Sequence, residues 1–162
     1  MMKRIGVVLI LIFAFLGISD SAYIAKSEMS NTPLICNVDS IFDCNIVAAS
    51  QYSHIFGIPL SVFGIIFYSF VFIIAAIELF IFNRLLRRAL QAISIIGIIA
   101  SLYFTFLEIF IIKALCVYCI ASAVITLLIL ISASFIEPIR NIIKYKPPAI
   151  PPRPPHFTMP PV

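Results

Sequence analysis

Charged residues are scarce in this sequence. They make up 11% of its 162 residues, whereas hydrophobic residues make up 62%. A soluble domain usually carries roughly 25% charged residues, so this chain lacks the side chains needed to cover a water-facing surface. Its formal net charge of +4 comes from short basic clusters between long apolar runs. Soluble globular, disordered and nucleic-acid-binding proteins are therefore excluded, and the composition predicts an integral membrane protein.

Four apolar runs are long enough to cross a bilayer, which takes about 18 or more residues. They lack the period-2 alternation of a transmembrane strand, and a helix satisfies its own backbone hydrogen bonds in lipid. Asp20 interrupts the first run near its far end, and we expect the helix to end over residues 20–23. Lys3 and Arg4 before this run also fit a cleaved signal peptide. We predict an all-α fold, a four-helix transmembrane bundle, with spans over residues 5–24, 55–82, 89–112 and 114–136.

Basic residues near the span ends predict the orientation of the chain. Two of the eleven, Lys26 and Lys113, fall on one side of the membrane. The other nine fall on the opposite side: Lys3, Arg4, Arg84, Arg87, Arg88, Arg140, Lys144, Lys146 and Arg153. Because basic residues concentrate in cytoplasmic segments, we expect a multi-pass protein of the cell membrane with both termini in the cytoplasm. The loop over residues 25–54 would then form an extracytoplasmic cap.

Two parts of the chain differ in composition. Residues 1–137 contain all four spans and are predicted to form the membrane domain. Residues 138–162 form a basic, proline-rich tail, with eight prolines between Pro147 and Pro161. Such a segment favours extended polyproline II or disorder, and we interpret it as a cytoplasmic spacer or docking segment.

The four cysteines all fall on the predicted outer side, where disulfides persist. Cys116 and Cys119 form a C-x-x-C at the expected start of the fourth helix, which places their sulfurs about one turn apart. The backbone N–H groups and dipole at a helix N-terminus stabilise a thiolate, the species that attacks disulfides. This motif therefore favours thiol–disulfide exchange.

Cys36 and Cys44 lie in the outer loop, where a large protein can reach them and from which electrons can pass inward. Four cysteines allow three pairings, and spacing alone does not choose among them. Two purely structural disulfides would use the same count of cysteines. A zinc site would need a closer second pair, and attachment of haem would need a histidine where Ile120 stands. We interpret the two pairs as a relay.

Several segments together resemble one known family. They are Cys36 and Cys44 with seven residues between them, Ser50, the pair Phe56–Gly57, the run SVFGIIFY over residues 61–68 and the run LCVYC over residues 115–119. In this order and spacing they are similar to the vitamin K epoxide reductase family, and closest to its bacterial and archaeal members. The resemblance covers residues 5–136.

The resemblance implies a quinone-dependent thiol–disulfide oxidoreductase that supports disulfide bond formation. Cys116 and Cys119 would be the active-site pair, with Cys119 nearest the quinone. Cys44 would pass electrons to Cys116, while Cys36 would react with the outside thiol. Ser50 matches a serine that the family places near the quinone. The other class of function that we weigh is a small structural or transport protein whose outer loops are stapled by disulfides.

Two positions depart from the animal enzymes, which have an asparagine where this chain has Leu60 and a tyrosine where it has Ala123. In the family these residues recognise vitamin K and its epoxide. Their absence puts epoxide reduction in doubt and leaves a membrane quinone, of the ubiquinone or menaquinone type, as the expected acceptor. Some bacterial members carry a fused thioredoxin-like domain. Here we expect that partner to be a separate extracytoplasmic protein.

Glu108 is the remaining candidate, because a carboxylate inside a membrane span is often functional. It could supply a proton to the quinone, or reach water or pair with Lys113. Glu78 is expected to form an ion pair with the nearby Arg84. His54 could donate a hydrogen bond to a quinone, but we interpret it as an ordinary interfacial histidine.

Overall fold

The computed structural model describes residues 2–36, 43–81 and 83–136. It confirms the predicted fold class, since four of its helices are long and apolar enough to cross a membrane. Its elements are α1 (Met2–Ser30), α2 (Cys44–Ala48), β1 (His54–Ile55), β2 (Ile58–Pro59), α3 (Leu60–Phe80), α4 (Arg84–Leu107), the π-helix η1 (Glu108–Ile112) and α5 (Val117–Ile136). The tail predicted over residues 138–162 lies outside the described residues.

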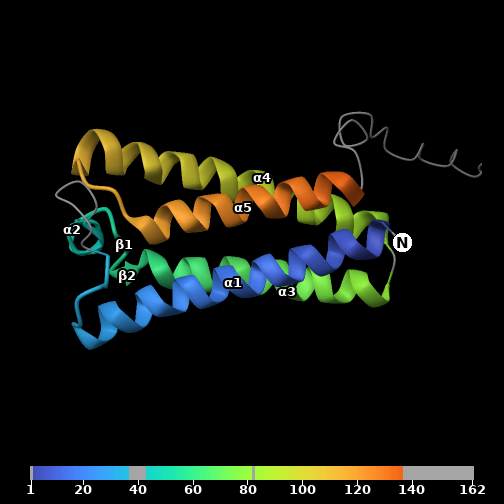
Figure 1. Cartoon of the computed structure of the whole chain (residues 1–162), viewed down its shortest axis with the longest axis horizontal. Helices are drawn as coiled ribbons and strands as arrows, with labels where there is room; N and C mark the ends of the chain where they lie inside the picture. The colour runs from blue at the N-terminus through green and yellow to red at the C-terminus, as the bar shows by residue number, and fades with distance from the viewer. Residues whose placement is uncertain (1, 37–42, 82, 137–162) are drawn as a thin grey trace, which may run out of the picture.

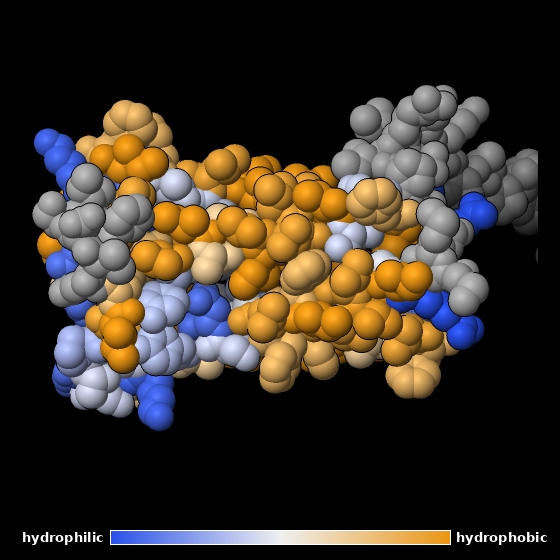
Figure 2. Space-filling model, viewed as in Figure 1, coloured by the Kyte–Doolittle hydropathy of each residue, from blue (hydrophilic) through white to orange (hydrophobic). Residues whose placement is uncertain are grey.

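The short elements gather at one end of the bundle, opposite the N-terminus (Figure 1). We call this the cysteine end, defined by α2, the antiparallel hairpin β1–β2 and residues 113–119. Figure 2 shows a face that is hydrophobic over most of its length, with hydrophilic residues towards both ends. This distribution is the one that a multi-pass membrane protein requires.

The ends of all four long helices differ from the predicted spans, and α4 begins at Arg84 and not at residue 89. α1 continues past residue 24 to Ser30, because the first residue with a left-handed backbone is Asn31, at φ 49°. α3 begins at Leu60 and not at residue 55, since residues 54–59 form the hairpin and Pro59 precedes the first turn. α5 begins at Val117 because Lys113, at φ 56°, turns the chain after η1. The prediction that α1 ends near Asp20 is therefore wrong.

α1 is the central helix of the bundle and packs most extensively against α3 and α5, while α4 packs chiefly against α5. The close approach of α1 to α3 depends on a glycine. A Cβ atom added at Gly17 would lie 2.5 Å from the ring of Tyr68. The main core lies between these helices and includes Ile10, Tyr68, Leu90 and Ile129. Packing through small residues is typical of helices in lipid, where apolar side chains gain little by leaving the solvent.

A buried ion pair lies at the end of the bundle away from the cysteines. Arg87 Nε is 3.1 Å from Glu78 Oε1, and the Glu78 side chain is almost fully buried. Glu78 Oε2 also accepts a hydrogen bond from the backbone N–H of Asn83. The prediction that Glu78 pairs with Arg84 is therefore wrong. Arg84 is the first residue of α4, and Arg87, the observed partner, lies almost one turn further along the helix.

Candidate functional site

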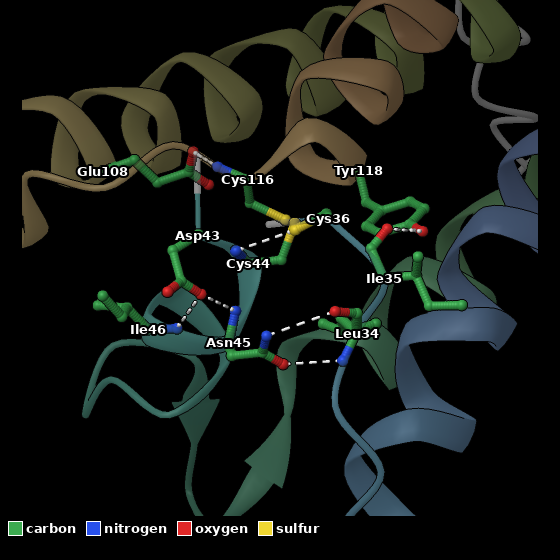
Figure 3. The surroundings of a disulfide bond; sticks show 10 residues. All are labelled: Leu34, Ile35, Cys36, Asp43, Cys44, Asn45, Ile46, Glu108, Cys116 and Tyr118. Carbon is green, nitrogen blue, oxygen red and sulfur yellow. Dashed lines mark hydrogen bonds between the residues drawn. A yellow bond between two sulfur atoms is a disulfide. The ribbon is translucent and has the colours of Figure 1, made fainter. Parts of the chain in front are cut away.

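The cysteine end contains a disulfide between Cys36 and Cys44, whose Cα atoms are 5.9 Å apart. Both residues are buried, in a cluster with Leu34, Val47, Ala114 and Cys116. The backbone N–H of Cys44 also donates to Cys36 Sγ at 3.0 Å. Figure 3 shows the side chain of Cys116 pointing toward this disulfide. The fold therefore brings the loop pair next to the first cysteine of the C-x-x-C motif.

Two polar residues of the loop hold the disulfide in place. Asp43 caps α2 by accepting hydrogen bonds from the backbone N–H groups of Asn45, at 2.9 Å, and Ile46, at 3.3 Å. The Asn45 side chain accepts from the Leu34 N–H at 2.8 Å and donates to the Leu34 carbonyl at 3.4 Å (Figure 3). We call this pair of bonds the Asn45–Leu34 clamp. Neither polar residue was predicted from the sequence, although an aspartate directly before a short helix is a recognisable capping signal.

Cys116 and Cys119 are free thiols, and they lie at the start of α5, where the sequence predicts the motif. Cys116 is buried and precedes the first residue of the helix, and its carbonyl accepts from the N–H of Ile120 at 3.1 Å. The Cys119 thiol donates a hydrogen bond to the Cys116 sulfur, which lowers the pKa of Cys116 below that of an ordinary thiol. A larger share of Cys116 is therefore thiolate, the form that attacks a disulfide.

Glu108 lies against both cysteines of the motif and is 3% exposed. Its Oε2 accepts the Cys116 N–H at 3.1 Å, and its carboxyl group is the alternative acceptor within reach of the Cys119 thiol. Glu108 is the first residue of η1. Among the described residues no ion pair joins it to Lys113. Glu108 thus contacts the C-x-x-C motif, and its part in the chemistry stays a prediction.

A cavity of about 340 Å³ opens inside the bundle beside these groups. Five of the six predicted site residues line it: Cys44, Ser50, Glu108, Cys116 and Cys119. Cys36 does not line the cavity, so Cys44 is the member of the loop pair that faces it. Ser50 donates to the Val47 carbonyl at 2.8 Å. His54 is exposed, and its Nδ1 lies 2.8 Å from the hydroxyl of Ser53, which agrees with an ordinary interfacial histidine.

Other polar groups line the same cavity and were not predicted as site residues. They are Asp20, Ser21, Glu28, Tyr52, Ser53, Ser61, Tyr68, Ser101, Thr105, Tyr118, Ser122 and Thr126. The hydroxyl of Tyr68 lies 2.7 Å from Ser122 Oγ and 2.9 Å from Thr126 Oγ1. Ser61 donates to Glu28 Oε2 at 2.5 Å. The helical sequence pattern could not identify these residues, because every helix of the bundle is apolar on most of its surface.

The sequence was compared with models of known protein families. The model of the vitamin K epoxide reductase family matches residues 8–134. The match begins within α1 and ends within α5, and it includes the four cysteines, Ser50 and Glu108.

Proposed function

This chain belongs to the vitamin K epoxide reductase family, and we propose that it oxidises a separate thioredoxin-like protein and passes the electrons to a quinone. Membership of the family makes it a membrane thiol–disulfide oxidoreductase. One observation carries the finer proposal. The Cys36–Cys44 disulfide and the Cys116 thiol share a buried cluster, and Cys44 and Cys116 both line the cavity.

Electron transfer between the pairs follows the rules of thiol–disulfide exchange. The partner's two thiols reduce Cys36–Cys44 and leave as a disulfide. The Cys44 thiolate then attacks Cys116 in a Cys116–Cys119 disulfide, and Cys119 leaves as a thiolate. The Cys36 thiolate attacks Cys44, which restores the loop disulfide and releases Cys116. The pairing in the structure, with Cys36–Cys44 joined and Cys116 and Cys119 free, is the state that follows these steps.

Glu108 and Cys119 prepare the reduced pair for its own oxidation. The Glu108 carboxylate, the alternative acceptor within reach of the Cys119 thiol, can take its proton when the thiol turns from Cys116. The N–H of Cys116 holds that carboxylate in position. Acid–base groups within hydrogen-bond distance of the reacting proton contribute typically 10²–10⁴-fold to a rate.

The cavity fits a quinone of the ubiquinone or menaquinone type. Its volume of about 340 Å³ lies in the range of small-molecule sites, and its lining is mainly apolar with a few polar groups. One of those groups, Asp20 Oδ2, is buried and has no hydrogen-bond partner among the described residues. Cys119, Glu108 and Ser50 would hold the head group. A bound quinone would accept two electrons and two protons and leave as the hydroquinone.

We also propose that the cysteine end faces the extracytoplasmic side. In the predicted topology, nine of the eleven basic residues lie on the opposite side of the membrane, and basic residues concentrate in cytoplasmic segments. A thiol oxidant is useful where disulfides persist, and that is the outer compartment.

A crosslinking experiment tests the order of transfer. The double variant Cys36→Ser/Cys119→Ser retains only Cys44 and Cys116, which should join almost completely under mild oxidation. The matched control, Cys44→Ser/Cys119→Ser, retains Cys36 and Cys116 and should give at most about a tenth as much crosslink. Non-reducing peptide mapping of protein in nanodiscs measures both. Equal crosslink yields in the two variants would refute Cys44 as the residue that passes electrons to Cys116. The absence of a crosslink in both variants would favour purely structural disulfides.

A further inference from the structure

Asp20 is a carboxyl group that the steps above do not use. It lies on α1, ten residues before the helix ends at Ser30, or about 15 Å along the axis. It lines the cavity, and its Oδ2 is buried without a hydrogen-bond partner among the described residues. An unpaired carboxylate in an apolar span is costly, so such groups are held neutral or serve a function.

The neighbours of Asp20 explain why it has no partner. Tyr68 of α3 is within electrostatic range, since the close contact at Gly17 brings α1 onto its ring. The Tyr68 hydroxyl, however, is engaged with α5 through Ser122 and Thr126. Tyr118 is the other group that interacts electrostatically with Asp20. Within the described part of the chain, Asp20 Oδ2 therefore has no hydrogen-bond partner, and the residue borders the cavity.

We propose that Asp20, as a neutral acid, donates a hydrogen bond to one carbonyl oxygen of the quinone and gives it a proton during reduction. This inference rests on the proposed function, because it names a second polar contact for the same acceptor. Oxidation of the Cys116 and Cys119 thiols to a disulfide releases two electrons and two protons, and hydroquinone formation consumes both. Asp20 transfers its proton to one oxygen and regains one of the protons that the thiols release.

The test compares Asp20→Asn and Asp20→Ala with wild-type, full-length protein in nanodiscs, using a short-chain ubiquinone and a short-chain menaquinone. Ser19→Ala is the matched control, because Ser19 is exposed on the same helix and its hydroxyl donates to the Phe15 carbonyl of its own helix. Three measurements are made: quinone affinity from quenching of tyrosine fluorescence, the carboxylic acid stretch in infrared difference spectra, and the single-turnover rate of Cys116–Cys119 oxidation.

The two variants separate binding from proton transfer. Asp20→Ala removes one hydrogen bond and should weaken quinone binding about fivefold. Asp20→Asn keeps a donor, so its affinity should stay within about twofold, while the rate should fall about 10²-fold. A carboxylic acid band should shift when wild-type protein binds quinone and be missing from both variants. Ser19→Ala should match the wild type in all three measurements.

The outcomes also distinguish this inference from the function on which it rests. If wild-type protein binds quinone but Asp20→Ala binds it equally well, or Asp20→Asn reacts at the wild-type rate, the role of Asp20 is refuted and the proposed function stands. If wild-type protein binds neither quinone, while a small dithiol still exchanges with Cys36–Cys44, the quinone part of the proposed function is refuted and this inference with it.

Discussion

Replacement of Glu108 by glutamine separates its chemical role from its structural one. The amide of Glu108→Gln would keep an oxygen that can accept the Cys116 N–H, now bonded at 3.1 Å, and would fill the same buried volume. It would lose the ability to take the proton of the Cys119 thiol. Replacing the carboxylate by an amide as acceptor of the Cys116 N–H should change the free energy of unfolding by about 1 kcal/mol or less. Loss of a positioned base should lower the rate of Cys116–Cys119 oxidation about 10²-fold.

Glu108→Ala provides the structural comparison. It leaves the buried Cys116 N–H without an acceptor, at about 1–3 kcal/mol, and removes the packing contacts of the side-chain carbons beyond Cβ, at about 1 kcal/mol. We therefore expect Glu108→Ala to be destabilised by about 2–4 kcal/mol and to be slow, and Glu108→Gln to be nearly as stable as wild type and equally slow.

The assay is a single turnover. Reduced protein in nanodiscs is mixed with quinone, quenched with an alkylating reagent and mapped for the Cys116–Cys119 disulfide, with thermal unfolding measured on the same samples. If Glu108→Gln reacts within about threefold of the wild-type rate, the carboxylate is not the base. If it is as unstable as Glu108→Ala, its loss of rate has a structural cause and the reasoning fails.

Two further predictions concern the thiol and the topology. Because the Cys119 hydrogen bond lowers the pKa of Cys116, alkylation of Cys116 should persist to lower pH in wild type and in Cys119→Ser, which keeps a donor, than in Cys119→Ala. A pH series read by mass spectrometry measures this, and coincident profiles for all three would contradict it. In a cysteine-free chain, an impermeant maleimide on intact cells should label Ile35→Cys, where the native residue is 84% exposed, and spare Leu85→Cys, at 71%. The reverse pattern would overturn the orientation.

The fold could be predicted because lipid leaves few alternatives. Four apolar runs define four helices once every backbone group must be satisfied within its own segment. The ends of the helices were harder. α1 continues through Lys26 and Glu28 because nothing there breaks a helix, and the first left-handed residue is Asn31. Hydropathy marks where a chain leaves the apolar layer, whereas the backbone marks where a helix stops.

The site could be predicted only where its residues carry a distinctive side chain. Cysteines are rare, so their positions identified the reactive end of the molecule, and the structure then brought Cys44 and Cys116 together. Glu108 was a candidate as a lone carboxylate, but its contact with Cys119 depends on the turn of η1 and on Lys113. The place of Asp20 in the cavity depends on how α1 rotates against Tyr68, which no local pattern encodes.

The Asn45–Leu34 clamp has a consequence for the reduced loop. The clamp joins the two stems of the loop by hydrogen bonds that do not involve sulfur. When the Cys36–Cys44 bond opens, the two thiols therefore stay near each other at a high effective concentration, without a second entropic cost of loop closure. In the proposed relay, attack of the Cys36 thiolate on Cys44 in the Cys44–Cys116 mixed disulfide should then outcompete attack by stray thiols from solution. We therefore expect a reduced loop to pass its electrons to Cys116 within the molecule rather than to disulfides of other proteins.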